Sequence, residues 1–119
     1  MRVGEFLDRP AERQEALTRF DQHDAPLHEA LLASVPVPVL RPLRERLLGP
    51  LAEYDDRHNA ELMTTLKAFL ACDGSWSACA SRMYVHVNTV RYRISRVEAL
   101  TGRDLSALAD RVDFFLALR

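Results

Sequence analysis

The sequence predicts an all-α protein, a small helical bundle. In most segments apolar residues recur every three or four positions, which is the period of an α-helix with one buried side. The 119 residues include only four glycines and six prolines, and most prolines stand at the ends of periodic segments. The one alternating stretch, SVPVPVL, contains two prolines that cannot donate to a β-ladder, so no strand is expected.

The first 40 residues are predicted to form an N-terminal helical segment that ends in a hinge. Residues 1–24 are highly charged, and their apolar residues indicate one or two short helices: Phe6, Leu7, Leu17 and Phe20. Pro26 can open a helix over residues 27–34, because the first turn of a helix does not need its amide. The stretch VPVPV then ends that helix, so residues 36–41 are expected to be a hinge before a main domain over residues 41–119.

The main domain is expected to begin with three helices. Residues 42–57 read as two short helices separated by a break at Gly49-Pro50. Asn59 is the expected N-cap of a stronger helix that Asp73-Gly74 ends. The apolar stripe of that helix consists of Leu62, Leu66, Phe69 and Leu70.

Three more helices are predicted in the C-terminal half. Ser77 is the expected N-cap of a short helix that reaches Val85, and Asn88 or Thr89 is the expected N-cap of a longer one that ends at Gly102. Ser106 is expected to start the last helix. Its inward-facing residues are predicted to be Leu108, Val112, Phe115 and Leu116, with Leu105 as a further candidate.

The short helix and the one after it have the packing pattern of a helix-turn-helix. A small residue allows two helices to cross closely, and apolar residues at fixed distances fill the wedge between them. These positions are Ala80, Met83, Val85, Val90 and Ile94. The pattern resembles the Fis-like subgroup, except that Tyr84 stands where many such motifs have a turn glycine. Either the turn is longer here, or Tyr84 itself adopts the left-handed backbone.

The second helix of this pair, about residues 88–101, is predicted to be a DNA-recognition helix. Its apolar stripe of Val90, Ile94, Val97 and Leu100 leaves a polar face on the other side. Asparagine and arginine can read base edges in the major groove, and arginine can also bind phosphates. The candidate DNA-binding residues are His86, Asn88, Thr89, Arg91, Tyr92, Arg93 and Arg96.

The local charge favours a nucleic-acid partner over a merely solvated helix. The chain has a net charge of −1, but five arginines and only one acid, Glu98, lie between Arg82 and Arg103. A solvated helix would usually interleave acidic partners. The alternative is a protein-interaction or dimerisation domain that docks an acidic partner through the same arginines.

Other classes of function find little support. No segment is long and apolar enough to be a membrane span. Cys72 and Cys79 are expected to be small thiols in a reducing cytoplasm, and no histidine stands at a metal-ligand spacing from them. Carboxylates cluster at Glu53, Asp55 and Asp56 without a catalytic partner. We therefore expect no enzyme activity, no catalytic residues, no metal and no cofactor.

Roughly residues 40–119 resemble the C-terminal DNA-binding domain of PucR-type transcriptional regulators, which include the carbohydrate-diacid regulators. The most specific part is His86, Asn88-Thr89, Arg91-Tyr92-Arg93 and Leu100-Thr101-Gly102. Weaker matches are Leu48-Gly49-Pro50-Leu51, Tyr54-Asp55, Leu62, Thr65-Leu66, Gly74 and Ala80. Val87 departs from the pattern, because that position is often basic in the family.

The resemblance implies a bacterial transcription factor in the cytoplasm that binds double-stranded DNA. It also implies a homodimer or higher homo-oligomer, because one short recognition helix binds weakly and two half-sites are the usual remedy. Members of the family usually carry an effector-sensing region, and residues 1–40 are too short to be one. The chain is therefore expected to be part of a longer regulator.

Overall fold

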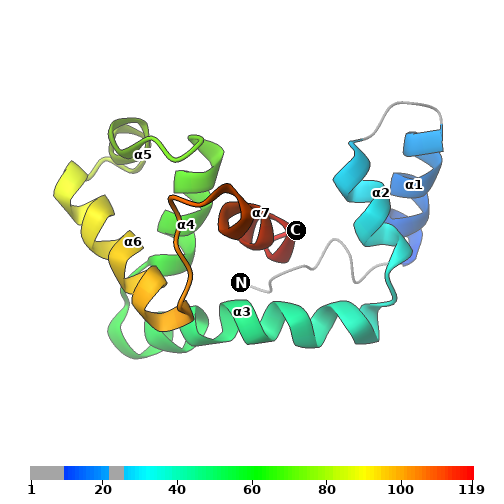
Figure 1. Ribbon diagram of the computed structural model, residues 1–119, viewed down its shortest axis with the longest axis horizontal. Helices are drawn as coiled ribbons and strands as arrows, with labels where there is room; N and C mark the ends of the chain where they lie inside the picture. The colour runs from blue at the N-terminus through cyan, green and yellow to red at the C-terminus, as the bar shows by residue number, and fades with distance from the viewer. Residues whose placement is uncertain (1–9, 22–25) are drawn as a thin grey trace. The chain divides into compact units, whose positions relative to one another are not determined.

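The computed structural model describes residues 10–21 and 26–119, and these residues form an all-α fold without strands (Figure 1). The helices are α1 (Pro10–Asp21), α2 (Leu27–Ser34), α3 (Val37–His58), α4 (Leu62–Ala71), α5 (Trp76–Met83), α6 (Val87–Thr101) and α7 (Leu108–Ala117). The predicted fold class is confirmed. The expected helix-forming residues Phe6 and Leu7 lie outside the described part of the chain.

The helices divide into two compact units. One contains the described residues up to Arg46 together with Leu116–Arg119, and the other is Leu47–Phe115. In the first unit α1 packs against α2, which begins after Pro26 as predicted. Buried Leu32 and Leu40 form a small core there. The predicted boundary between residues 40 and 41 stays a prediction.

Helix α3 is one continuous helix of 22 residues, so the predicted break at Gly49-Pro50 was wrong. Residues 37–41, which were assigned to a hinge, are its first residues. A proline inside a helix costs about 3 kcal/mol, because it removes a hydrogen bond and crowds the preceding turn. Leu48 and Leu51, on either side of Gly49-Pro50, are buried, and their burial together stabilises the fold by about 3–6 kcal/mol. Their burial offsets the cost of the proline.

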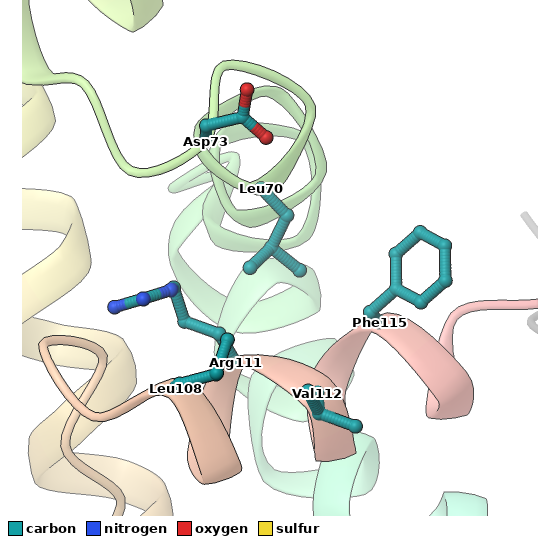
Figure 2. A pocket seen from close by; sticks show the side chains of 6 residues that line it. All are labelled: Leu70, Asp73, Leu108, Arg111, Val112 and Phe115. Atoms are coloured by element: carbon teal, nitrogen blue, oxygen red, sulfur yellow. The ribbon is translucent and has the colours of Figure 1, made fainter.

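The inward face of α7 also differs from the prediction. Phe114 is completely buried and Leu105 nearly so, whereas Leu108, Val112 and Phe115 are exposed to different degrees. Figure 2 shows these last three side chains around an open surface pocket that they share with Arg111 of the same helix and with Leu70 and Asp73. The prediction was therefore wrong for Leu108, Val112 and Phe115, whereas Leu105 is buried as predicted and Leu116 is half-buried.

A polar residue, Asp110, lies on the buried side of α7, one turn before Phe114, whereas Arg111 lies on the side of the pocket. Asp110 accepts hydrogen bonds from the backbone amide of Asp104 (2.9 Å) and from the Arg103 guanidinium (3.0 Å). Arg111 donates to the carbonyl oxygen of Leu105 at 2.9 Å. These bonds hold the connection between α6 and α7 in place. The inner face of α7 is therefore partly polar, and hydrophobicity alone does not mark it.

None of the helices in the described ranges is long and apolar enough to cross a lipid bilayer.

Candidate nucleic-acid interface

Helices α4, α5 and α6 pack against one another in the second unit (Figure 1). Helix α5 starts two residues earlier than predicted, because Ser75 and not Ser77 is its N-cap. The Ser75 hydroxyl accepts a hydrogen bond from the backbone amide of Ala78 at 3.2 Å. Ala80, the predicted crossing residue, is buried in this helix.

The turn between α5 and α6 is built on Tyr84, which itself takes the left-handed conformation (φ 57°, ψ 40°). The amide of Val85 donates back to the carbonyl of Ala80 at 3.1 Å, so the turn closes around Tyr84. Of the two alternatives that the sequence left open, the structure shows this one. The Tyr84 side chain is 95% exposed, so it contributes no packing to the turn.

Helix α6 is capped by His86 and not by Asn88 or Thr89. The Nδ1 atom of His86 accepts a hydrogen bond from the backbone amide of Asn88 at 3.0 Å. This arrangement leaves the Asn88 side chain free of capping, and Asn88 is exposed while Thr89 is half-buried. The predicted end at Gly102 is confirmed, since Gly102 is the left-handed C-cap (φ 71°).

One face of α6 is buried as predicted. Val90, Ile94 and Val97 are almost completely inaccessible, and Leu100 is half-buried at the end of the stripe. Because these residues occupy one side, the residues between them must face outward or sideways.

The first half of the polar face is open to solvent. Arg91 and Tyr92 are exposed, and so is Asn88 one turn earlier. The Arg91 guanidinium carbon lies 4.8 Å from the centroid of the Trp76 ring at the start of α5. This cation–π contact orients Arg91 while the residue stays accessible.

The other two arginines are held by the body of the domain. Arg93 forms an ion pair with Glu61, with 3.4 Å between Nη2 and Oε2, and its side chain is only 19% exposed. The Arg96 guanidinium carbon lies 5.0 Å from the centroid of the Tyr54 ring on α3. Each of the three arginines thus contacts a different neighbouring helix or its N-cap. The sequence does not reveal this division, because its spacing places all three outside the apolar stripe.

The start of α4 is capped by Asp55, a residue of the acidic cluster, and not by the predicted cap Asn59. The Asp55 carboxylate, on α3, accepts hydrogen bonds from the amides of Leu62 (2.7 Å) and Met63 (3.0 Å). Asn59, the predicted cap, and Glu61, the actual N-cap residue, both have left-handed backbones, and the Glu61 side chain makes no capping bond. A carboxylate near a helix N-terminus stabilises the helix. The acidic cluster of Glu53, Asp55 and Asp56 was the feature of the sequence that could have indicated this cap.

The thiols of the domain give no sign of a reactive site. Cys79 is fully buried, and burial raises the pKa of its thiol, which disfavours the reactive thiolate. Within residues 10–21 and 26–119, no group of three or more His, Cys, Asp or Glu side chains is placed to hold a metal ion.

Comparison with known proteins identifies the C-terminal half of the chain. Residues 62–119 match the family described as the PucR C-terminal helix-turn-helix domain. These residues are a PucR C-terminal helix-turn-helix domain. The match begins at Leu62, later than the resemblance in the sequence indicated, and it includes all seven candidate DNA-binding residues from His86 to Arg96.

Three relatives illustrate where such domains occur. The uncharacterized protein in the pkwA 5′ region of Thermomonospora curvata is 49% identical over 72 residues, which is 60% of this chain and 39% of that protein. The transcriptional activator PmfR of Paenarthrobacter nicotinovorans is 39% identical over 63% of this chain and 16% of its own length. The DNA-binding transcriptional activator AdeR of Bacillus subtilis is 26% identical over 60% of this chain and 17% of its own length.

The matched regions therefore span less than two fifths of these relatives. No solved structure gives a significant match to the chain.

Proposed function

We propose that this chain is the DNA-binding module of a bacterial transcriptional regulator and that α6 enters the major groove of a DNA duplex. The PucR helix-turn-helix family and the two relatives named as transcriptional activators support this role. The observation that carries the proposal is the exposed face of α6 formed by Asn88, Arg91 and Tyr92, opposite the buried side chains of Val90, Ile94 and Val97.

The chemistry of this face fits a duplex. The side chain of Asn88 can donate and accept hydrogen bonds at an adenine edge, and Arg91 can bind a guanine edge or a phosphate. His86 and Thr89 lie beside them at the N-terminus of α6, where the backbone dipole favours a phosphate. This arrangement supports recognition and binding, and it contains no group for which we propose a catalytic role.

We further propose that the chain acts as a homodimer or higher homo-oligomer. One recognition helix of 15 residues offers few contacts, and two copies that read half-sites about one helical turn apart are the usual remedy.

The first test is selection of bound sequences from a pool of random DNA duplexes. We expect enrichment of a motif with two half-sites, and their spacing reports the oligomeric state. Recovery of no motif, together with weak binding that does not depend on salt, would contradict the proposal.

The second test measures duplex affinity as a function of salt concentration for Arg91→Ala and Asn88→Ala. Arg91→Ala should weaken binding and reduce the log–log salt slope by about 0.9 if it contacts one phosphate. Asn88→Ala should weaken binding to the selected motif more than to random duplex. Arg57→Ala is the matched control, because Arg57 is an exposed arginine on α3 in an ion pair with Glu53.

The same variants separate DNA binding from the alternative of an acidic protein partner. If Arg91→Ala abolished capture of an acidic protein and left duplex affinity unchanged, the protein-interaction function would replace the proposed one.

A further inference from the structure

We propose that Arg93 is a positioning residue: it fixes α6 against the start of α4 and does not itself bind DNA. This inference rests on the proposed function, because it concerns how the exposed face of α6 is aimed at a duplex. It differs from the expectation from sequence, in which Arg93 was one of the DNA contacts.

Both ends of the Arg93 guanidinium are occupied by groups at the start of α4. Nη2 pairs with the Glu61 carboxylate at 3.4 Å, and Nη1 donates to the Thr65 hydroxyl at 3.3 Å. The Thr65 hydroxyl in turn donates to the backbone carbonyl of Glu61 at 2.8 Å. Arg93 is thus linked to Glu61 twice, directly through the carboxylate and indirectly through Thr65.

The burial of these groups argues against a phosphate contact. The Arg93 side chain is 19% exposed, and Thr65 is completely buried. To reach a phosphate, the largely buried Arg93 guanidinium would have to give up both its ion pair with Glu61 and its hydrogen bond to the Thr65 hydroxyl, and hydrogen bonds to charged groups are costly to break. Arg91, by contrast, is exposed and has no such bond to give up.

The position of this contact explains what it would do. Successive residues of an α-helix are rotated by about 100°, so a side chain fixed at residue 93 fixes the directions of residues 91 and 92 as well. The start of α4 is itself held by Asp55, whose carboxylate caps Leu62 and Met63. The contact of Arg93 therefore fixes the rotation of α6 about its own axis relative to the capped start of α4. A helix that binds in a DNA groove needs such a defined rotation.

The decisive variant is Thr65→Val, because a completely buried residue cannot touch DNA. It keeps the shape of the side chain and every charge, and it removes only the hydroxyl between Arg93 and Glu61. We expect duplex affinity to fall about two- to tenfold, the lower part of the range for residues coupled in one hydrogen-bond network, with an unchanged salt slope. Thr64→Val, at the exposed neighbouring position, is the matched control and should bind like wild type.

Arg93→Ala completes the test in the 119-residue chain. Its affinity for the random duplex should fall while the log–log salt slope stays at the wild-type value, in contrast to Arg91→Ala. The double variant Thr65→Val/Arg93→Ala should bind no more weakly than Arg93→Ala, because both changes break the same link. Circular dichroism at the temperature of the binding assay establishes that each variant is folded, so that a loss of stability alone is not read as a loss of affinity.

A slope reduced by about 0.9 in Arg93→Ala would overturn the inference, since it would make Arg93 a phosphate contact. Unchanged affinity in both Thr65→Val and Arg93→Ala would also overturn it. Either result leaves the proposed function intact as long as Arg91→Ala weakens binding, whereas a wild-type chain that binds no duplex would overturn both.

Discussion

Helices α6 and α7 are neighbours in sequence but distribute their apolar residues differently. In α6 the buried residues Val90, Ile94 and Val97 lie on one side, and the outer side is polar. In α7 apolar residues lie on more than one side: Phe114 is completely buried, while Leu108 is 67% exposed. Asp110 lies on the side of Phe114 and Arg111 on the side of Leu108, and both bind the preceding connection.

The difference shows which interactions position each of the two helices. The position of α6 is set by an apolar stripe, with Arg93 adding a polar link at one point. The position of α7 is set by one large buried ring near its end and by polar bonds to backbone groups at its beginning. Substitutions should therefore affect the two helices in different ways.

The largest effect is expected for Phe114→Ala. Removal of a fully buried aromatic ring should lower the free energy of unfolding by about 3–5 kcal/mol, because it loses apolar burial and leaves a cavity. Leu108→Ala on the same helix is the control and should change it by no more than about 0.5 kcal/mol. Urea denaturation measures both, and equal effects would mean that the two sides of α7 are not distinct.

A smaller loss is expected where α5 crosses α6. Ala80→Leu adds volume at a buried position and should destabilise the domain by about 1–3 kcal/mol and weaken duplex binding. Ser81→Leu, at the exposed neighbouring position, is the control. A folded Ala80→Leu variant with wild-type affinity and wild-type stability would show that Ala80 does not limit the approach of the two helices.

A gain in stability is expected for Tyr84→Gly. A side chain with a left-handed backbone is strained, and the exposed tyrosine ring contributes no packing, so glycine should stabilise the domain by up to about 1 kcal/mol. Tyr84→Ala keeps the Cβ atom and should bring no such gain. Thermal unfolding of the three proteins compares them, and a lower melting temperature for Tyr84→Gly than for Tyr84→Ala would contradict the assignment of strain.

The smallest effect is a dependence on pH at the beginning of α7. The hydrogen bond from the Asp104 amide, and then the one from Arg103, hold the pKa of Asp110 below its ordinary value. The stabilisation is therefore present above the ordinary pKa of about 4 and is lost as the pH falls through the lowered one. Asp110→Asn should melt below wild type near neutral pH, and the difference should shrink in acid. A difference independent of pH would exclude this role.

The same contrast explains how much of the fold follows from the sequence. The apolar stripe of α6 and its glycine end were predicted, because apolar residues there occupy one face and Gly102 has a left-handed backbone. The inner face of α7 was not, since its first turns are positioned by hydrogen bonds of Asp110 and Arg111 to backbone groups of the preceding connection, and apolar periodicity does not detect such bonds. The continuity of α3 was also missed, because local rules weigh Gly49-Pro50 and not the burial of Leu48 and Leu51.

The candidate interface was predictable in its location but not in its details. The helix-turn-helix pattern and the PucR motif point to α5 and α6, and residues 62–119 belong to that family. The caps were misassigned, because Ser75 and His86 compete with neighbours that are equally good capping residues in sequence. The ion pair of Arg93 with Glu61 joins residues 32 positions apart, and periodicity within one helix carries no information about such a partner.

The cap that Asp55 provides limits how many residues could be removed from the N-terminal side of this domain. Asp55 lies upstream of the residues that define the family match, yet it satisfies the first two amides of α4. A truncated protein starting at Leu62 would lose that carboxylate, together with Glu61 beside Arg93 and the Tyr54 ring beneath Arg96. The smallest autonomous piece that keeps α6 correctly oriented must therefore start before Tyr54, several residues ahead of the family signature.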